Sequence, residues 1–118
     1  LVELMPDTVV SENDMVVKDR FGLEANAFNA LVYYGPDSNM DAAELLLVDM
    51  KDTSQKETVT DAIQKRIDYQ KTCFEGYGVD QMELINQAKT VVYGHYVLFI
   101  VSKDSQPARD AFAEAVTK

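Results

Sequence analysis

The stretch KTVVYGHYVLFIVS, residues 89–102, constrains the fold of this chain more than any other. It consists of two runs rich in β-branched and aromatic residues on either side of Gly94 and His95. Glycine at the first central position of a two-residue loop favours a type II′ hairpin turn, which sets Tyr93 opposite Tyr96. Because both faces of this hairpin are apolar, we expect it inside a sheet, with neighbouring strands on both sides.

The rest of the chain predicts further helices and strands. AFNALVYYG and AELLLVDM are short apolar runs bounded by glycine, proline and polar residues, as strands are. Ser54 followed by Glu57 fits a capping box at the start of a long helix with an apolar stripe at 3.6-residue spacing. The predicted order is helix 12–21, strand 27–35, strand 43–50, helix 54–75, helix 80–88, the hairpin, and a last helix capped by Asp104 or Ser105.

The two halves of the chain share local sequence as well as element order. LLLVDMKDTSQ at 45–55 and VLFIVSKDSQ at 97–106 both run from an apolar strand through a Lys-Asp pair into a helix. One interpretation is a duplicated α-β-β-α unit, with the halves related by a pseudo-two-fold axis in one antiparallel sheet. The other is convergence, because hairpins and helix caps draw on few residue types. On either interpretation the fold class is α+β, with about four antiparallel strands in two hairpin-like pairs and helices packed on them.

Length and composition indicate one domain. The chain has 118 residues, of which 47% are hydrophobic, and this suffices for one core. Residues 1–10 are weakly patterned and begin without methionine, so we interpret them as a loosely ordered lead-in from a longer precursor. Residues 11–118 then form a single α+β domain. The longest apolar runs are far shorter than the roughly 20 residues that a membrane-spanning helix needs.

The net charge of the chain excludes some classes of partner. It is −9, from 20 acidic and 11 basic residues, and no basic cluster occurs in the sequence. Nucleic-acid binding depends on neutralising phosphates with lysine and arginine, so we expect no nucleic-acid partner. Anionic membrane surfaces are disfavoured for the same reason.

The reactive side chains have simpler structural interpretations. His95 is the only histidine and occupies the hairpin turn, where a polar residue is expected. Cys73 falls on the apolar stripe of the long helix, where a thiol is buried and inert. Asp49, Asp52 and Asp104 stand at strand ends near helix starts. Helix capping and surface roles are their default interpretation, although paired carboxylates can perform acid–base chemistry. We therefore assign no catalytic, cofactor-binding or metal residue.

The segment DSNMD, residues 37–41, partly matches a calcium-binding loop. Asp37, Asn39 and Asp41 match the 1-3-5 spacing of EF-hand ligands. The sixth position is Ala42 instead of glycine, and the twelfth is Val48 instead of glutamate. A solvated loop between two strands is the better interpretation.

Tyrosines mark the candidate contact surface. Tyr33, Tyr34, Tyr93 and Tyr96 all lie where predicted strands meet turns. A side chain with one apolar side and one polar end suits contact with a ligand or a protein. It equally suits the margin of a sheet beneath a helix.

From Ala43 onward the chain resembles a bacterial family catalogued as domain of unknown function 4358. The resemblance is carried by AELLLVDMKD, the long capped helix, FEGYGVDQMELI and VVYGHYVLFIVSKD, in which His95 replaces the family's usual asparagine. Members look like small secreted lipoproteins, mostly of Gram-positive gut bacteria. The resemblance implies export and a lipid anchor on a cysteine upstream of Leu1. It implies no reaction and no site residue.

These observations predict a non-enzymatic extracytoplasmic lipoprotein domain that contacts a protein, a peptide or a cell-envelope component. It would need no cofactor and would meet the membrane only through its anchor. The alternatives are an acid-residue hydrolase, which needs a concave pocket with two carboxylates of separated pKa, and a small-ligand or cation-binding domain. The sequence leaves the oligomeric state open.

Overall fold

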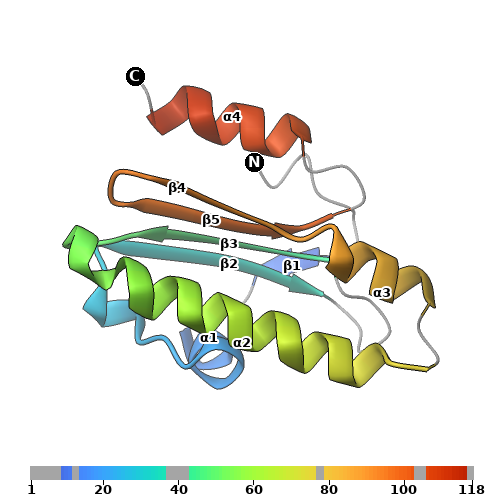
Figure 1. The fold of residues 1–118 in the computed structure, drawn as a ribbon. Helices are drawn as coiled ribbons and strands as arrows, with labels where there is room; N and C mark the ends of the chain where they lie inside the picture. The colour runs from blue at the N-terminus through green and yellow to red at the C-terminus, as the bar shows by residue number, and fades with distance from the viewer. Residues whose placement is uncertain (1–8, 12–13, 37–42, 77–78, 103–105, 117–118) are drawn as a thin grey trace.

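The structure is a computed structural model that describes residues 9–11, 14–36, 43–76, 79–102 and 106–116. Within this part of the chain, five strands form one antiparallel sheet in the order β1-β2-β3-β5-β4 (Figure 1). The strands are β1 (Val9–Ser11), β2 (Ala30–Pro36), β3 (Glu44–Asp49), β4 (Lys89–Tyr93) and β5 (Tyr96–Val101).

Helices cover both faces of the sheet. The long helix α2 and the shorter α1 lie on one face, α3 packs against α2, and α4 lies on the opposite face (Figure 1). None of the described helices is long and apolar enough to cross a membrane. The helices are α1 (Asp14–Phe21), α2 (Lys56–Phe74), α3 (Val79–Asn86) and α4 (Gln106–Val116), with short 3-10 turns η2 (Ala25–Ala27) and η3 (Thr53–Gln55).

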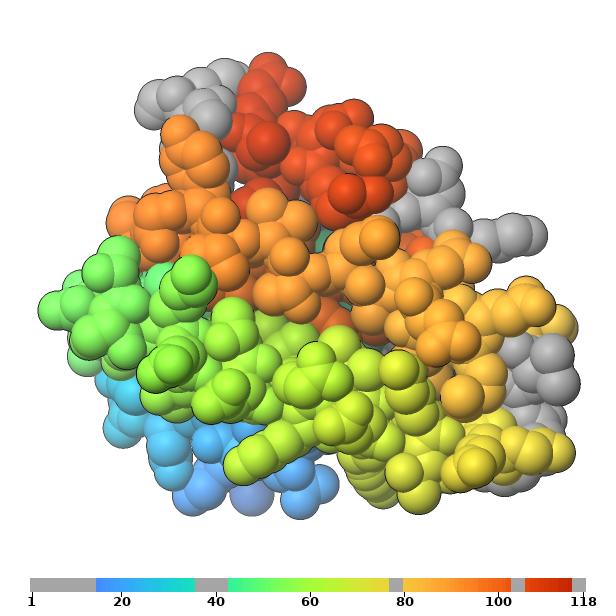
Figure 2. Space-filling model, viewed as in Figure 1, coloured from blue at the N-terminus to red at the C-terminus, as the bar shows by residue number. Residues whose placement is uncertain are grey.

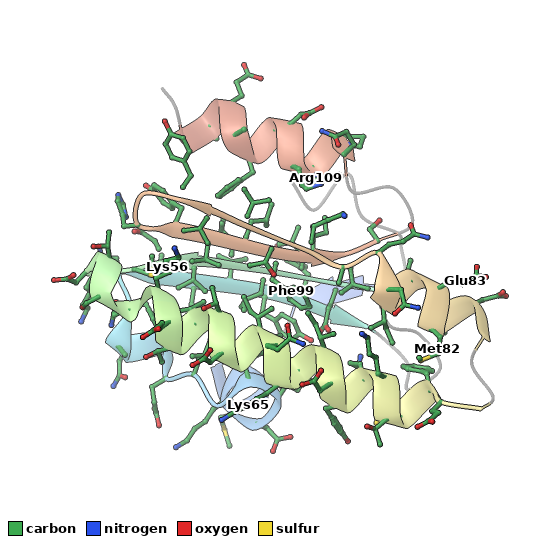
Figure 3. All side chains as sticks on the ribbon, viewed as in Figure 1. Lys56, Lys65, Met82, Glu83, Phe99 and Arg109 are labelled. Atoms are coloured by element: carbon green, nitrogen blue, oxygen red, sulfur yellow. The ribbon has the colours of Figure 1, made fainter. Side chains whose placement is uncertain are left out.

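The core has two layers because successive side chains of the central strands β3 and β5 point to opposite faces. On the α2 side, Phe99 of β5 lies between the sheet and the helix (Figure 3). On the α4 side, Leu98 and Phe112 are fully covered. Each fully buried side chain of this kind contributes about 1.5–3 kcal/mol. The α2-side layer also contains Leu46, Val48, Val59, Ile63 and Val97, and the α4-side layer contains Leu45, Ile100 and Ala108.

The predicted α+β class, the element order and the hairpin register are confirmed. Tyr93 pairs with Tyr96 and Val91 with Leu98, and Gly94 has φ +58°, as the turn requires. The expected position of the hairpin is wrong for one strand. β5 is central, but β4 pairs with β5 alone among the described strands and forms a margin of the sheet. Val91 packs against the α4-side layer and Val92 against the α2-side layer, so the two apolar faces of β4 do not require a further neighbouring strand.

Two local features differ from the sequence interpretation. Val9 and Val10, assigned to the lead-in, form part of β1 and pair with β2, so the sheet gains a fifth strand. The capping box at Ser54 is wrong, because the 3-10 turn η3 precedes α2. The Asp52 side chain accepts a hydrogen bond from the Ser54 backbone N–H at 2.8 Å and caps this turn.

A two-fold axis relating the two halves of the chain agrees with the strand order but not with the positions of α2 and α4. The order β2-β3-β5-β4 is the one that an axis perpendicular to the sheet, between antiparallel β3 and β5, would produce. Rotation about such an axis does not exchange the two faces of the sheet, so equivalent helices would pack on the same face. The two equivalent helices, α2 and α4, instead pack on opposite faces (Figure 1). Duplication of the whole α-β-β-α unit therefore does not describe the packing of the helices.

Candidate functional site

A buried polar network joins α1, β2, β3 and α2 inside the α2-side layer. The Nε atom of Arg66 donates to the Glu44 carboxylate, at 3.3 Å from Oε1 and 3.2 Å from Oε2. The Tyr33 hydroxyl donates to Glu44 Oε1 at 2.5 Å, and Arg20 Nη1 donates to the Tyr33 hydroxyl at 3.0 Å. Within the described residues, every buried side-chain nitrogen or oxygen has a hydrogen-bond partner. The network thus links α1, β2, β3 and α2 to one another through side-chain hydrogen bonds.

The sequence places this network at positions that otherwise carry apolar residues. Glu44 begins the apolar strand β3, and Arg66 follows Ile63 by three residues on the buried stripe of α2. Gly35 makes room for the network, because a Cβ atom there would lie 2.5 Å from Arg20 Nη1 and 2.8 Å from the Tyr33 hydroxyl. Sequence reasoning missed the pair of Glu44 and Arg66. The signal that could have revealed it is Arg66, a charged residue on the apolar stripe of α2.

Burial and the neighbouring carboxylate keep the Tyr33 hydroxyl protonated. Burial raises the pKa of Tyr33 well above its usual value of 10.0, and the negative charge and hydrogen bond of Glu44 raise it further, against the opposing effects of Arg66 and Arg20. Tyr33 therefore stays a neutral donor at physiological pH. A buried ion pair whose remaining lone pairs are occupied specifies geometry more than it adds net stability.

A second polar contact ties the end of β3 to the hairpin turn. His95 Nδ1 lies 2.6 Å from Asp49 Oδ1, and the Met50 backbone N–H donates to the His95 carbonyl at 2.7 Å. The His95 ring lies 4.2 Å from the Tyr96 ring, centroid to centroid. Sequence reasoning treated His95 as a lone turn residue, because the carboxylate that meets it is 46 residues away in the chain.

Of the remaining candidate groups of the sequence, two lie within the described residues. Asp52 caps η3 with an exposed side chain, and Cys73 packs, partly buried, against the small cluster of Phe74 and Ile85. Asp104 and the segment 37–41, which includes the candidate calcium ligands, lie outside the described residues. In the part of the chain that is described, no group of three or more His, Cys, Asp or Glu side chains could hold a metal ion.

The four candidate tyrosines are divided between the two faces of the sheet. Tyr33 is 2% exposed in the α2-side layer, so it is part of the core and belongs to no contact surface. Tyr34 and Tyr96 are partly buried on the α4 side. Tyr93 pairs with Tyr96 and is 48% exposed. Three of the four candidate tyrosines, Tyr34, Tyr93 and Tyr96, therefore lie on the α4 side.

The α4 side of the sheet also has an apolar strip that the helix leaves open. α4 packs against β4 and β5, and the sheet continues beyond it to β3 and β2. Val32 of β2 is 43% exposed, with Leu47 opposite it on β3, and Tyr34 follows Val32 on the same face of β2. Leu47 and Tyr34 are partly buried against the layer beneath α4. We name Val32, Tyr34 and Leu47 the open strip.

Comparison with known proteins gives one match. The family model described as Domain of unknown function (DUF4358) matches residues 5–102, a range that includes all five described strands and α1 to α3. No curated protein and no solved structure matches the chain.

Proposed function

The chain belongs to the family described as Domain of unknown function (DUF4358), and from this premise we propose a non-enzymatic extracytoplasmic domain whose open strip binds a protein or peptide partner. The observation that carries the proposal is Val32. Its side chain is 43% exposed in the middle of β2, whereas Leu45 of the neighbouring strand β3 and Leu98 of β5, on the same face of the sheet, are buried. Val32 adjoins Leu47 and Tyr34 on this face, and a contiguous apolar surface of this kind fits a site that a second molecule covers.

The composition of the open strip suits a protein interface. Val32 and Leu47 supply apolar area, which gains about 25 cal/mol per Å² when it is removed from water. Tyr34, partly buried at the end of the strip, supplies a large ring with a polar end, a residue type enriched in interfaces. The strip thus combines an apolar centre with an aromatic margin.

The charge of the domain selects among partners. A net charge of −9 steers cationic partners toward the surface and repels anionic ones. The partner we propose therefore has an apolar anchor side chain for the open strip and basic residues around it. The proposal places the domain outside the cytoplasm, held by a lipid anchor upstream of Leu1. The resemblance to secreted lipoproteins supports this location.

A hydrolase based on Asp49 and Asp52 is not part of the proposal. Asp49 is held by His95 at 2.6 Å, and Asp52 is held by the Ser54 backbone at 2.8 Å. Asp49 is the last residue of β3 and Asp52 precedes η3, and each carboxylate already has a hydrogen-bond partner.

Photo-crosslinking in the native cell envelope tests the proposal. A benzoylphenylalanine residue at Val32 is expected to give a discrete crosslinked protein band. The same residue at Lys65, which is exposed on α2 (Figure 3), is the matched control and is expected to give none. Equal labelling at the two positions, or none at Val32 in correctly exported protein, would contradict the proposal.

A further inference from the structure

The strand β4 offers unpaired backbone groups at the margin of the sheet. In a hairpin closed by a two-residue turn, the residues flanking the turn form a hydrogen-bonded pair, here Tyr93 and Tyr96. Pairs alternate along the ladder, so Val91 also bonds to β5. Thr90 and Val92 then direct their N–H and C=O groups away from β5. No other described strand lies on that side.

These outward groups are complementary to themselves under a two-fold axis. If the axis passes between Val91 and its copy, Thr90 of one chain lies opposite Val92 of the other, and the reverse. Each of these pairs exchanges both N–H···O bonds, so the register uses all the outward groups of the two residues. A shift by one residue would set outward groups against inward ones and lose the bonds.

Side chains along β4 agree with this register. Val91 meets its own copy, an apolar pair at the centre. Lys89, the only charged residue of the strand, lies opposite Tyr93 of the second copy, a residue that is 48% exposed in the single chain. An ammonium group beside a tyrosine ring is attractive, and no like charges face each other.

The surroundings leave this margin accessible. Lys89, Thr90 and Tyr93 are exposed. Figure 2 shows the orange residues of the α3–β4 region at the surface between α2 and α4. Because the axis is perpendicular to the sheet, both copies of α2 lie on one face of the joined sheet and both copies of α4 lie on the other.

We propose that β4 pairs antiparallel with β4 of a second copy of this chain, about a two-fold axis at Val91, to form one continuous sheet. This interface is at the β4 margin, separated from β2 by β5 and β3, and does not depend on the open strip. Each copy carries a net charge of −9, so the copies repel each other at low ionic strength. Added salt screens this repulsion and strengthens the pairing.

Sedimentation of the full 118-residue chain tests the interface. The chain is expected to form a dimer below about 0.5 mM protein, more strongly at about 0.5 M NaCl than at about 0.05 M. Thr90→Pro removes one outward N–H and leaves the bonds to β5 intact, so it is expected to weaken dimerisation at least about tenfold. Thr90→Val keeps the N–H and is the matched control. A monomer at about 0.5 mM in high salt, or equal dimerisation of the two variants, overturns the proposal.

A second measurement reports the register directly and decides the question if Thr90→Pro fails to fold. In a Cys73→Ser background, Val91→Cys brings two thiols together across the axis and is expected to form a disulfide-linked dimer under mild oxidation. Lys65→Cys on the outer side of α2 is the control and stays monomeric. Absence of the Val91→Cys dimer, or equal yields from the two positions, overturns the proposed pairing.

Discussion

The Nε atom of Arg66 lies 3.2 Å from Oε2 of Glu44, and the two side chains are only 7% and 1% exposed. The pair joins the long helix α2 to the first residue of β3. Charges taken out of water this completely are costly unless each finds partners, and here Tyr33 supplies a further hydrogen bond to the carboxylate. The pair therefore sets where α2 sits along the sheet.

Removal of one member of this pair should be strongly destabilising. Arg66→Met leaves the Glu44 carboxylate buried without its cation and is expected to lower the free energy of unfolding by about 3–5 kcal/mol. The double variant Glu44→Leu with Arg66→Met removes both charges, so its loss should fall below the sum of the single losses by more than about 1 kcal/mol. Urea unfolding of the four proteins measures this, and additive losses would show that the pair is not coupled.

The raised pKa of Tyr33 predicts a loss of stability at alkaline pH. The folded chain keeps the phenol proton to higher pH than the unfolded chain, whose pKa is near the usual 10.0. The stabilisation is fully present below pH 10 and falls above it, by about 1.4 kcal/mol per pH unit. Thermal unfolding from pH 8 to 11 should show this slope in the wild type and a shallower one in Tyr33→Phe. Parallel slopes would rule out Tyr33 as the titrating group.

Gly35 is expected to be intolerant of a side chain. A Cβ atom would lie 2.8 Å from the Tyr33 hydroxyl and 2.5 Å from Arg20 Nη1. Gly35→Ala should therefore cost about 1–3 kcal/mol of unfolding free energy by crowding the network. Arg20→Met in the same chain removes the guanidinium and should recover part of that loss. A fully additive double variant would mean that Arg20 is not the group displaced.

The sequence predicted local structure better than it predicted contacts between distant residues. The pairing of Tyr93 with Tyr96 followed from the turn and from alternation along two adjacent strands, so it needed no tertiary information. Glu44 and Arg66 are 22 residues apart, and their contact depends on where α2 docks. The margin position of β4 was missed for a related reason, since helices on both faces give the same apolar pattern as neighbouring strands.

His95 is expected to contribute little to stability. Its contact with Asp49 is at the surface, with the histidine side chain 48% exposed, and exposed ion pairs are worth about 0–1 kcal/mol. His95→Asn also preserves a polar turn residue. The free energy of unfolding should change by less than about 1 kcal/mol in urea titration at pH 7. A larger loss would assign the pair a structural role that its exposure does not suggest.

Val32 should be dispensable for folding, in contrast to the buried network. Its side chain is 43% exposed, so Val32→Lys should change the free energy of unfolding by no more than about 0.5 kcal/mol. Leu98, fully buried on the same face of the sheet, is the comparison, and Leu98→Ala should cost about 2–5 kcal/mol. Thermal or urea unfolding of both variants distinguishes an exposed strip from a covered core.

A competition experiment at Val32 tests the central claim, that the open strip binds a partner, most directly. The photo-crosslink from position 32 is formed in the native envelope in the presence of excess unlabelled domain. Wild-type competitor is expected to abolish the crosslinked band, and folded Val32→Lys competitor is expected to leave it. A band that both competitors remove, or that neither removes, would contradict a binding site on this strip.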